Sequence, residues 1–209
     1  MNKEDLVSVI MPTYNAGKYL ADSMNSILNQ TYKNLELLIT DDASTDPTTL
    51  QLLKEYASKD ERVNILYLKE NHGAGYARNK SIERAKGRYI AFCDSDDRWT
   101  TDKLEKQIAF MNKKKCALSC ASYIIFDGET QNEIGFCTAP KKITYGMMKR
   151  DNKVGCLTAI YDVQMLGRKF FMPTIRKRQD WALFLQIIRE CKVCYAYPDK
   201  PLAYYCMRR

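Results

Sequence analysis

Short apolar runs alternate with helical patterns over the first hundred residues of the chain. Apolar and β-branched residues are concentrated at residues 6–11, 35–40, 63–68 and 89–93, and runs of this length are typical of buried strands. Between these runs, apolar side chains recur at the spacing of one helix face. Three strand–helix alternations followed by a fourth strand predict an α/β fold with a parallel, doubly wound sheet.

Local signals bound the helices between these strands. The first helix is expected over residues 19–28. Asp46 before Pro47 is the pairing of an N-cap with a first helical residue, so it predicts the start of the second helix. The third helix is expected over residues 76–85, with Gly87 as the residue that stops it.

The pattern is less regular beyond Trp99. Leu104 and Met111 share one face of a predicted helix, and another helix opens at Gln179. Shorter elements are expected as strands at residues 117–126, 134–137, 157–161, 192–197 and 202–206, and as a helix at residues 145–149. No linker-like or repetitive segment interrupts the chain, so residues 1–209 are expected to form one domain.

Polar side chains gather where three of the strands end. They are Pro12, Thr13, Tyr14 and Asn15 after the first strand, Asp41 and Asp42 after the second, and Asp94, Ser95 and Asp96 after the fourth. Arg78 and Asn79 lie on the first turns of the third helix. A parallel sheet brings its carboxyl ends to one edge, where open α/β sheets bind ligands. Carboxylates there can bind a nucleobase or ribose hydroxyls, so the pattern predicts a nucleotide-diphosphate site.

Asp94 and Asp96 are candidates for metal binding. Side chains two residues apart in an extended segment point the same way, so these carboxylates are expected to converge. Converging carboxylates repel unless a positive group lies between them. A divalent cation shared with substrate phosphates suits such oxygen ligands. The alternative is an acidic turn that caps the next helix.

Charge is distributed unevenly along the chain. Residues 1–109 contain 15 Lys and Arg against 17 Asp and Glu, whereas residues 110–209 contain 18 against 8. The basic half predicts an anionic partner (nucleic acid, anionic lipid or a phosphate-bearing substrate) or a solvated basic surface. No apolar run reaches the ~20 residues of a membrane span. The apolar run near the N-terminus is too short for a signal peptide, so a cytoplasmic location is expected.

Eight cysteines are present, and four of them form two closely spaced pairs. Cys116 pairs with Cys120, and Cys191 with Cys194. A zinc site would need both pairs to meet, or a histidine, and His72 is the only histidine in the sequence. The chain is too long and too helical in pattern for a disulfide scaffold, so buried free thiols are expected.

Four motifs together resemble those of family 2 glycosyltransferases with the GT-A fold. They are Val9-Ile-Met-Pro-Thr-Tyr-Asn15, Asp41-Asp-Ala-Ser-Thr-Asp46, Gly75-Tyr-Ala-Arg-Asn79 and Phe92-Cys-Asp-Ser-Asp-Asp97. A fifth, Arg178-Gln-Asp-Trp-Ala-Leu183, resembles the family's acidic stretch before a helix. The resemblance implies a Rossmann-like, mostly parallel sheet flanked by helices, with a smaller mixed region on the acceptor side. Residues 1–99 would bind the nucleotide sugar and residues 100–209 the acceptor.

The same resemblance implies roles for individual residues. Those that would bind the nucleotide, usually a uridine one, are Pro12, Thr13, Tyr14, Asn15, Asp41, Asp42, Arg78, Asp94 and Ser95. Asp96, with Asp94, would bind Mn²⁺ or Mg²⁺, which neutralises the departing nucleotide diphosphate. Asp180 would be the general base that takes the acceptor's hydroxyl proton in one inverting displacement. Trp181 would pack under the acceptor sugar.

The implied partners are a nucleotide-sugar donor and a saccharide or lipid-linked acceptor in cell-surface polysaccharide synthesis. The basic half would then make peripheral contact with the anionic inner face of the cell membrane. The sequence departs from the family at Gln179, where Glu is frequent, and at Cys206, where Arg is common. Relatives also continue through a basic segment over the phosphates, whereas this sequence ends at Arg209, either as a piece of a longer protein or as a short member.

Other interpretations of the same residues remain open. Asp42 alone is compatible with a turn residue, Arg78 with an exposed helix arginine, and Asp180 with a helix N-cap. A D-x-D phosphotransferase is disfavoured because it would carry its motif on the first strand, whereas Asp94 and Asp96 follow the fourth. A nucleic-acid-binding module is disfavoured because the basic residues lack interleaved aromatic platforms. A dinucleotide site is disfavoured because Arg78 replaces the third glycine after Gly73 and Gly75. A catalytically impaired nucleotide-binding relative is a further alternative.

Overall fold

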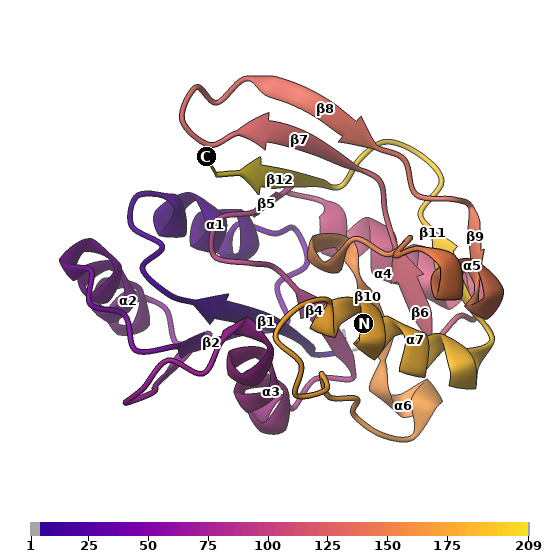
Figure 1. Cartoon of the computed structure of the whole chain (residues 1–209), viewed down its shortest axis with the longest axis horizontal. Helices are drawn as coiled ribbons and strands as arrows, with labels where there is room; N and C mark the ends of the chain where they lie inside the picture. The colour runs from indigo at the N-terminus through magenta and orange to yellow at the C-terminus, as the bar shows by residue number, and fades with distance from the viewer. Residues whose placement is uncertain (1–4, 209) are drawn as a thin grey trace.

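The computed structural model describes residues 5–208, and the first half of the chain forms one side of its main sheet (Figure 1). The strands β1 (Val7–Thr13), β2 (Leu35–Asp41), β3 (Val63–Tyr67) and β4 (Tyr89–Phe92) are parallel neighbours. All four predicted strands are therefore present, and the prediction of a parallel α/β sheet is confirmed for this half.

Strands from the second half extend the same sheet. They are β6 (Leu118–Cys120), β9 (Lys142–Thr144), β10 (Ile160–Asp162) and β11 (Val193–Ala196). The eight strands lie in the order β3-β2-β1-β4-β10-β6-β11-β9. Because β10 runs antiparallel to both β4 and β6, the sheet becomes mixed beyond β4.

A smaller sheet lies beside the main one (Figure 1). Its strands are β5 (Arg98–Trp99), β7 (Tyr123–Asp127), β8 (Glu133–Cys137) and β12 (Ala203–Met207), in the order β5-β12-β7-β8. β12 is parallel to β7 and antiparallel to β5. This sheet is the smaller mixed region that was expected, and through β12 it brings the end of the chain back to the segment after Asp97.

Helices pack on both faces of the main sheet. The longer ones are α1 (Tyr19–Leu28), α2 (Pro47–Lys59), α3 (Ala74–Arg84), α4 (Lys103–Lys114) and α7 (Gln179–Cys191), and the short ones are α5 (Tyr145–Arg150) and α6 (Val163–Leu166). Successive residues of β1 point to opposite faces. Val9 packs in a cluster with residues of α1 and α4, and Ile10 in one with residues of α3 and α7. The sheet thus has a hydrophobic core on each side.

The boundary signals are confirmed at one helix and wrong at another. Asp46 caps α2, since its carboxylate accepts a hydrogen bond of 2.7 Å from the backbone N–H of Thr49. Gly87 does not stop α3, which ends at Arg84. A Cβ on Gly87 would lie 2.6 Å from the backbone nitrogen of Ser8, so glycine is needed there for close approach to β1.

Two predicted strands prove to be composite. The segment 117–126 divides into β6 and β7, because residues 121–122 carry the chain from the main sheet to the small one. The segment 157–161 begins with a 3₁₀ turn, Cys156–Thr158, before β10. Within residues 5–208 no helix is long and apolar enough to cross a membrane.

The eight cysteines are free thiols, as expected, although Cys137, Cys156 and Cys191 are only half-buried. The sulfurs of Cys120 and Cys194 lie 3.7 Å apart, so the two sequence pairs do approach each other. Even so, no group of three or more His, Cys, Asp or Glu suited to a metal ion occurs among the described residues.

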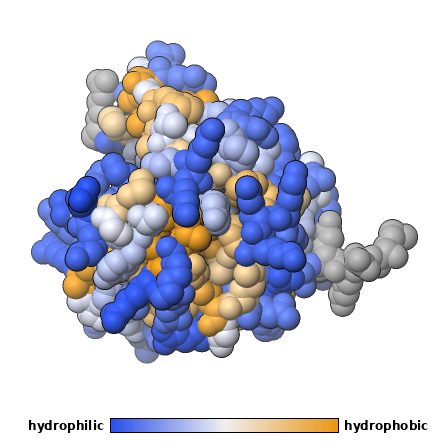
Figure 2. Space-filling view, turned by 90° about the vertical axis from the view of Figure 1, so that its right-hand side faces the viewer, coloured by the Kyte–Doolittle hydropathy of each residue, from blue (hydrophilic) through white to orange (hydrophobic). Residues whose placement is uncertain are grey.

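On the side of the molecule where β9 and α5 lie, hydrophilic side chains surround a hydrophobic centre (Figure 2).

Candidate active site

A cavity of about 170 Å³ opens at the carboxyl edge of β1, β2 and β4. The residues that line it are Pro12, Thr13, Tyr14, Asp42, Ala74, Arg78, Asp94, Ser95, Asp96 and Arg208. The structure therefore brings together every predicted nucleotide and metal residue except Asn15 and Asp41. Tyr14 is half exposed at this cavity, where its ring can stack on a flat base.

Arg78 and Asp94 form an ion pair at the base of this cavity. One guanidinium nitrogen of Arg78 donates to both carboxylate oxygens of Asp94, at 2.6 and 2.7 Å. Arg78 is 5% exposed, so it is not the surface arginine of the alternative interpretation. Its Nε and the Oγ1 of Thr13 are buried polar atoms without a hydrogen-bond partner among the described residues. Unsatisfied buried polar atoms at a cavity are typical of a binding site.

Asp96 lies on the other side of the same cavity. Burial, followed by repulsion from Asp94, raises the pKa of the Asp96 carboxyl. The Nε of Arg208 donates to Asp96 at 2.7 Å, and the guanidinium of Arg208 also lies over the ring of Tyr19. The end of β12 thus places a positive charge beside the second carboxylate. Sequence reasoning did not predict this contact, because it depends on the return of β12 to the D-x-D segment.

Asp42 holds the loop that precedes α3. Its two carboxylate oxygens accept hydrogen bonds from the backbone N–H groups of His72, at 2.9 Å, and Gly73, at 2.7 Å. Gly73 has a φ of 89°, a conformation that favours glycine. Asp42 is not a turn residue leading to Asp46, as the alternative interpretation had it. It lines the cavity and fixes the start of the helix that carries Arg78.

Asn15 and Asp41 lie outside the lining of the cavity, and their side chains connect two loops. The amide oxygen of Asn15 accepts hydrogen bonds from the backbone N–H groups of residues 45 and 46. The carboxylate of Asp41 accepts hydrogen bonds from the hydroxyl and the N–H of Ser44. These contacts support the loops after β1 and β2, and nucleotide contact by either side chain stays a prediction.

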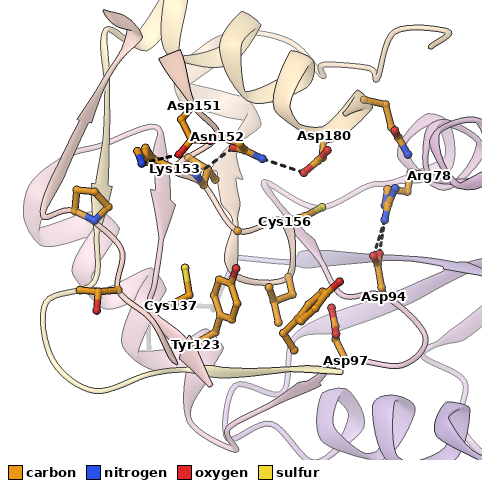
Figure 3. A pocket seen from close by; sticks show the side chains of 17 residues that line it. Arg78, Asp94, Asp97, Tyr123, Cys137, Asp151, Asn152, Lys153, Cys156 and Asp180 are labelled. Atoms are coloured by element: carbon orange, nitrogen blue, oxygen red, sulfur yellow. Dashed lines mark hydrogen bonds and ion pairs between the residues drawn. The ribbon is translucent and has the colours of Figure 1, made fainter. Parts of the chain in front are cut away.

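A second cavity, of about 540 Å³, shares Arg78 and Asp94 with the first (Figure 3). Its other walls come mainly from the second half of the chain and include Asp97, Tyr123, Cys137, Asn152, Lys153, Cys156, Asp180 and Tyr205. The Arg78–Asp94 pair therefore stands between a small cavity at the sheet edge and a larger polar one. Such an arrangement suits a donor nucleotide on one side and an acceptor on the other.

Asp180 reaches the larger cavity from the second position of α7 (Figure 3). Its Oδ2 accepts a hydrogen bond of 3.2 Å from the side-chain amide of Asn152. The N-cap of α7 is Arg178, with a φ of 61° and no side-chain capping bond. The interpretation of Asp180 as the helix cap is therefore wrong, and its carboxylate is available to a ligand.

Trp181 and Asp97 have structural contacts. The indole N–H of Trp181 donates to the carbonyl of Met148 at 2.6 Å, which joins α7 to α5, and Trp181 does not line the larger cavity. Acceptor contact by Trp181 stays a prediction. Asp97 is 2% exposed and accepts a hydrogen bond of 2.9 Å from the backbone N–H of Cys206. Burial, with repulsion from Asp94, raises the pKa of Asp97 well above its usual range. Asp97 thus anchors β12 at the site.

The fold is that of GT-A glycosyltransferases. The chain belongs to glycosyl transferase family 2, whose family model matches residues 8–171. This confirms the resemblance seen in the motifs, and the match covers the whole sheet edge described above.

Two curated relatives resemble the chain over most of its length. It is 43% identical over 194 residues to the putative teichuronic acid biosynthesis glycosyltransferase TuaG of Bacillus subtilis, a match that covers 93% of this chain and 76% of TuaG. It is 40% identical over 185 residues to the UDP-Glc:alpha-D-GlcNAc-diphosphoundecaprenol beta-1,3-glucosyltransferase WfgD of Escherichia coli, covering 88% of this chain and 70% of WfgD.

A solved structure with the same fold is that of S. aureus TarS 1-349 in complex with UDP. It superposes with a TM-score of 0.77 at 22% identity, and the match covers 96% of this chain and 60% of that one. The chain thus spans about three fifths of that solved structure and about three quarters or less of the two curated relatives.

Proposed function

We propose that this protein is an inverting glycosyltransferase. It moves a sugar from a nucleotide sugar, with UDP as the nucleotide, to a saccharide or lipid-linked acceptor in cell-surface polysaccharide synthesis. The observation that carries the proposal is the place of Asp180, whose carboxylate faces the same cavity as Asp94 and does not cap its helix. The name of WfgD supports a UDP-sugar donor and a lipid-linked acceptor, and the name of TuaG supports a role in polysaccharide synthesis.

The chemistry assigned to the chain's own residues is one displacement. The acceptor hydroxyl oxygen bonds to the anomeric carbon as the bond from that carbon to the diphosphate oxygen breaks. Asp180 takes the hydroxyl proton, and the nucleotide diphosphate leaves with the bonding electron pair. Attack from the face opposite the leaving group inverts the anomeric configuration, so no covalent nucleophile is needed.

The donor side is assigned to residues 1–99 and the acceptor side to residues 100–209. The cavity beside Tyr14 and Asp42 takes the base and ribose. The buried Oγ1 of Thr13 and Nε of Arg78 have no hydrogen-bond partner within residues 5–208 and can donate to the nucleotide. The side-chain amide of Asn152 donates to the carboxylate of Asp180 and holds it in the larger cavity.

A divalent cation fits the carboxylates at the sheet edge. Asp96 and Asp94 line one cavity, and such cations are commonly held by one or two carboxylates together with substrate phosphates. Mn²⁺ or Mg²⁺ bound there would supply positive charge to the leaving diphosphate. Arg208 pairs with Asp96 at 2.7 Å, so a bound cation would share this carboxylate with the guanidinium or displace it.

Calorimetry with UDP tests the donor site. UDP should bind more tightly with Mn²⁺ than without it, because the cation joins two anionic partners, and Asp96→Ala should abolish that difference. Asp22→Ala, which removes an exposed carboxylate on α1, is the matched control and should leave the difference intact. UDP affinity that is indifferent to metal and to Asp96 would refute the metal assignment. Absence of UDP binding, with no sugar transfer from UDP sugars, would refute the proposal that the protein is a UDP-sugar glycosyltransferase.

A further inference from the structure

The segment between Asp162 and Asp180 contains five basic residues and no acidic one. The basic residues are Arg168, Lys169, Arg176, Lys177 and Arg178. Arg168 pairs with Glu190 and Lys169 donates to the carbonyl of Glu83. Arg176 and Lys177 are exposed and form no ion pair with any acid that the structure describes. Their charges are free to meet an anionic partner.

The same segment displays apolar side chains from a fixed backbone. Asn79 of α3 donates to the carbonyl of Met172 and accepts from its N–H, both at 2.8 Å. Phe170 and Met172 are each only 3% exposed, whereas Phe171 between them is 41% exposed and Ile175 is 48% exposed. The two hydrogen bonds between Asn79 and Met172 therefore fix the backbone so that Phe171 points outward. Ile175 is exposed next to Arg176, which forms no ion pair within residues 5–208.

We propose that residues 171–178, the docking segment, bind the surface of an anionic lipid bilayer. A lipid interface takes apolar side chains into the headgroup boundary, and its anionic headgroups attract Lys and Arg side chains. It therefore matches both the exposed apolar residues and the positive charge of the docking segment. A nucleic acid would match only the positively charged side chains and would leave Ile175 in water. The inference rests on the proposed function, since a lipid-linked acceptor is carried on such a surface.

Docking on this segment orients the catalytic site toward the bilayer. Asp180 follows Arg178 by two residues, at the start of α7. A groove of about 630 Å³ runs between residues 173–176 and residues 71–76, and it shares Ala74 with the nucleotide cavity. Both substrate cavities thus lie near the docking segment, so a membrane-bound acceptor approaches along the side that carries Asp180.

Sedimentation with vesicles of phosphatidylcholine, with or without phosphatidylglycerol, tests the docking segment. The wild-type chain should bind the anionic vesicles, and salt should weaken binding. The double variant Arg176→Gln and Lys177→Gln should reduce partitioning about 30-fold, since each base near the surface contributes about fivefold. Arg178 is left intact because it occupies the N-cap position of α7 and its guanidinium lies over the ring of Trp181.

The matched control is the double variant Lys33→Gln and Lys54→Gln, which removes two exposed charges from other parts of the surface and should change binding less than twofold. Ile175→Ser keeps the charge and should reduce binding roughly fivefold through lost apolar burial. Equal binding to neutral and anionic vesicles, an equal loss in the control, or preference for duplex DNA over vesicles would overturn the proposal.

UDP calorimetry on the same variants separates the two proposals. The docking variants should bind UDP as the wild type does, because none of the substituted residues lines the nucleotide cavity. UDP binding and sugar transfer without vesicle binding would overturn docking alone. Vesicle binding without UDP binding would overturn the enzymatic proposal and leave docking in place.

Discussion

Lys103 is buried at the start of α4, and its replacement should stabilise the protein. The side chain is fully buried, with Nζ 4.2 Å from the centroid of the Trp99 ring and 3.0 Å from the amide oxygen of Gln107. No carboxylate pairs with it among the described residues. Burial lowers the pKa of Lys103 to about 7, because the charged form loses its hydration.

The pH dependence follows from the direction of this shift. Between about pH 7 and its ordinary pKa of 10.5, Lys103 binds a proton in the unfolded chain but less fully in the folded one. Stability therefore rises with pH across this window, by up to about 1.4 kcal/mol per pH unit, and the full penalty applies below pH 7. Between pH 7.5 and 9.5 the contribution from Lys103 should improve by roughly 2 kcal/mol.

Lys103→Met removes the titrating group and keeps much of its volume. We expect the variant to be more stable than the wild type at pH 7.5 by about 1–3 kcal/mol, after a loss from the unpaired Gln107 amide. Urea unfolding at several pH values measures the difference, which should shrink as pH rises. Lys113→Met, an exposed position on the same helix, is the control and should show no such trend. A Lys103→Met difference that is constant from pH 7.5 to 9.5 would contradict a lowered pKa for Lys103.

Three further substitutions test other contacts. Gly87→Ala should lower the free energy of unfolding by about 1–3 kcal/mol, since its Cβ would meet the backbone of Ser8; unchanged urea unfolding would contradict this. Asn152→Ala should reduce kcat about tenfold with donor affinity unchanged, because the carboxylate of Asp180 loses the side-chain donor that orients it; a wild-type kcat would contradict this positioning role. Asp42→Ala should cost about 1–3 kcal/mol of stability as well as UDP affinity, since two backbone N–H groups lose their acceptor.

Much of the donor half could be predicted because its information is local. Apolar runs placed β1 to β4, and the rule that parallel strands end at one edge brought Thr13, Asp42 and Asp94 together. The side-chain contacts were less predictable. Asp42 and Arg78 were expected at the sheet edge, but the sequence did not predict that both are buried there with specific partners.

The acceptor half resisted prediction because its contacts join residues far apart in sequence. Asn152 lies in a loop without a periodic pattern, and its bond to Asp180 spans 28 residues. The contact of β12 with Asp97 spans 109 residues. A helix start at Gln179 was predictable, but the left-handed backbone of Arg178, which releases Asp180 from capping, has no signal in the residue type.

Sugar transfer by Asp180→Asn is the decisive measurement for Asp180 as the general base. The substitution keeps the size of the side chain and removes its basicity, and it should not unfold α7, because Asp180 does not cap that helix. With a UDP sugar and a saccharide or lipid-linked acceptor, in an assay limited by chemistry, transfer should fall by ~10²–10⁴-fold. Donor affinity and the urea midpoint should stay near wild type, and the wild-type product should have the inverted anomeric configuration. Transfer by the Asn variant at the wild-type rate would contradict the role of Asp180 as the base.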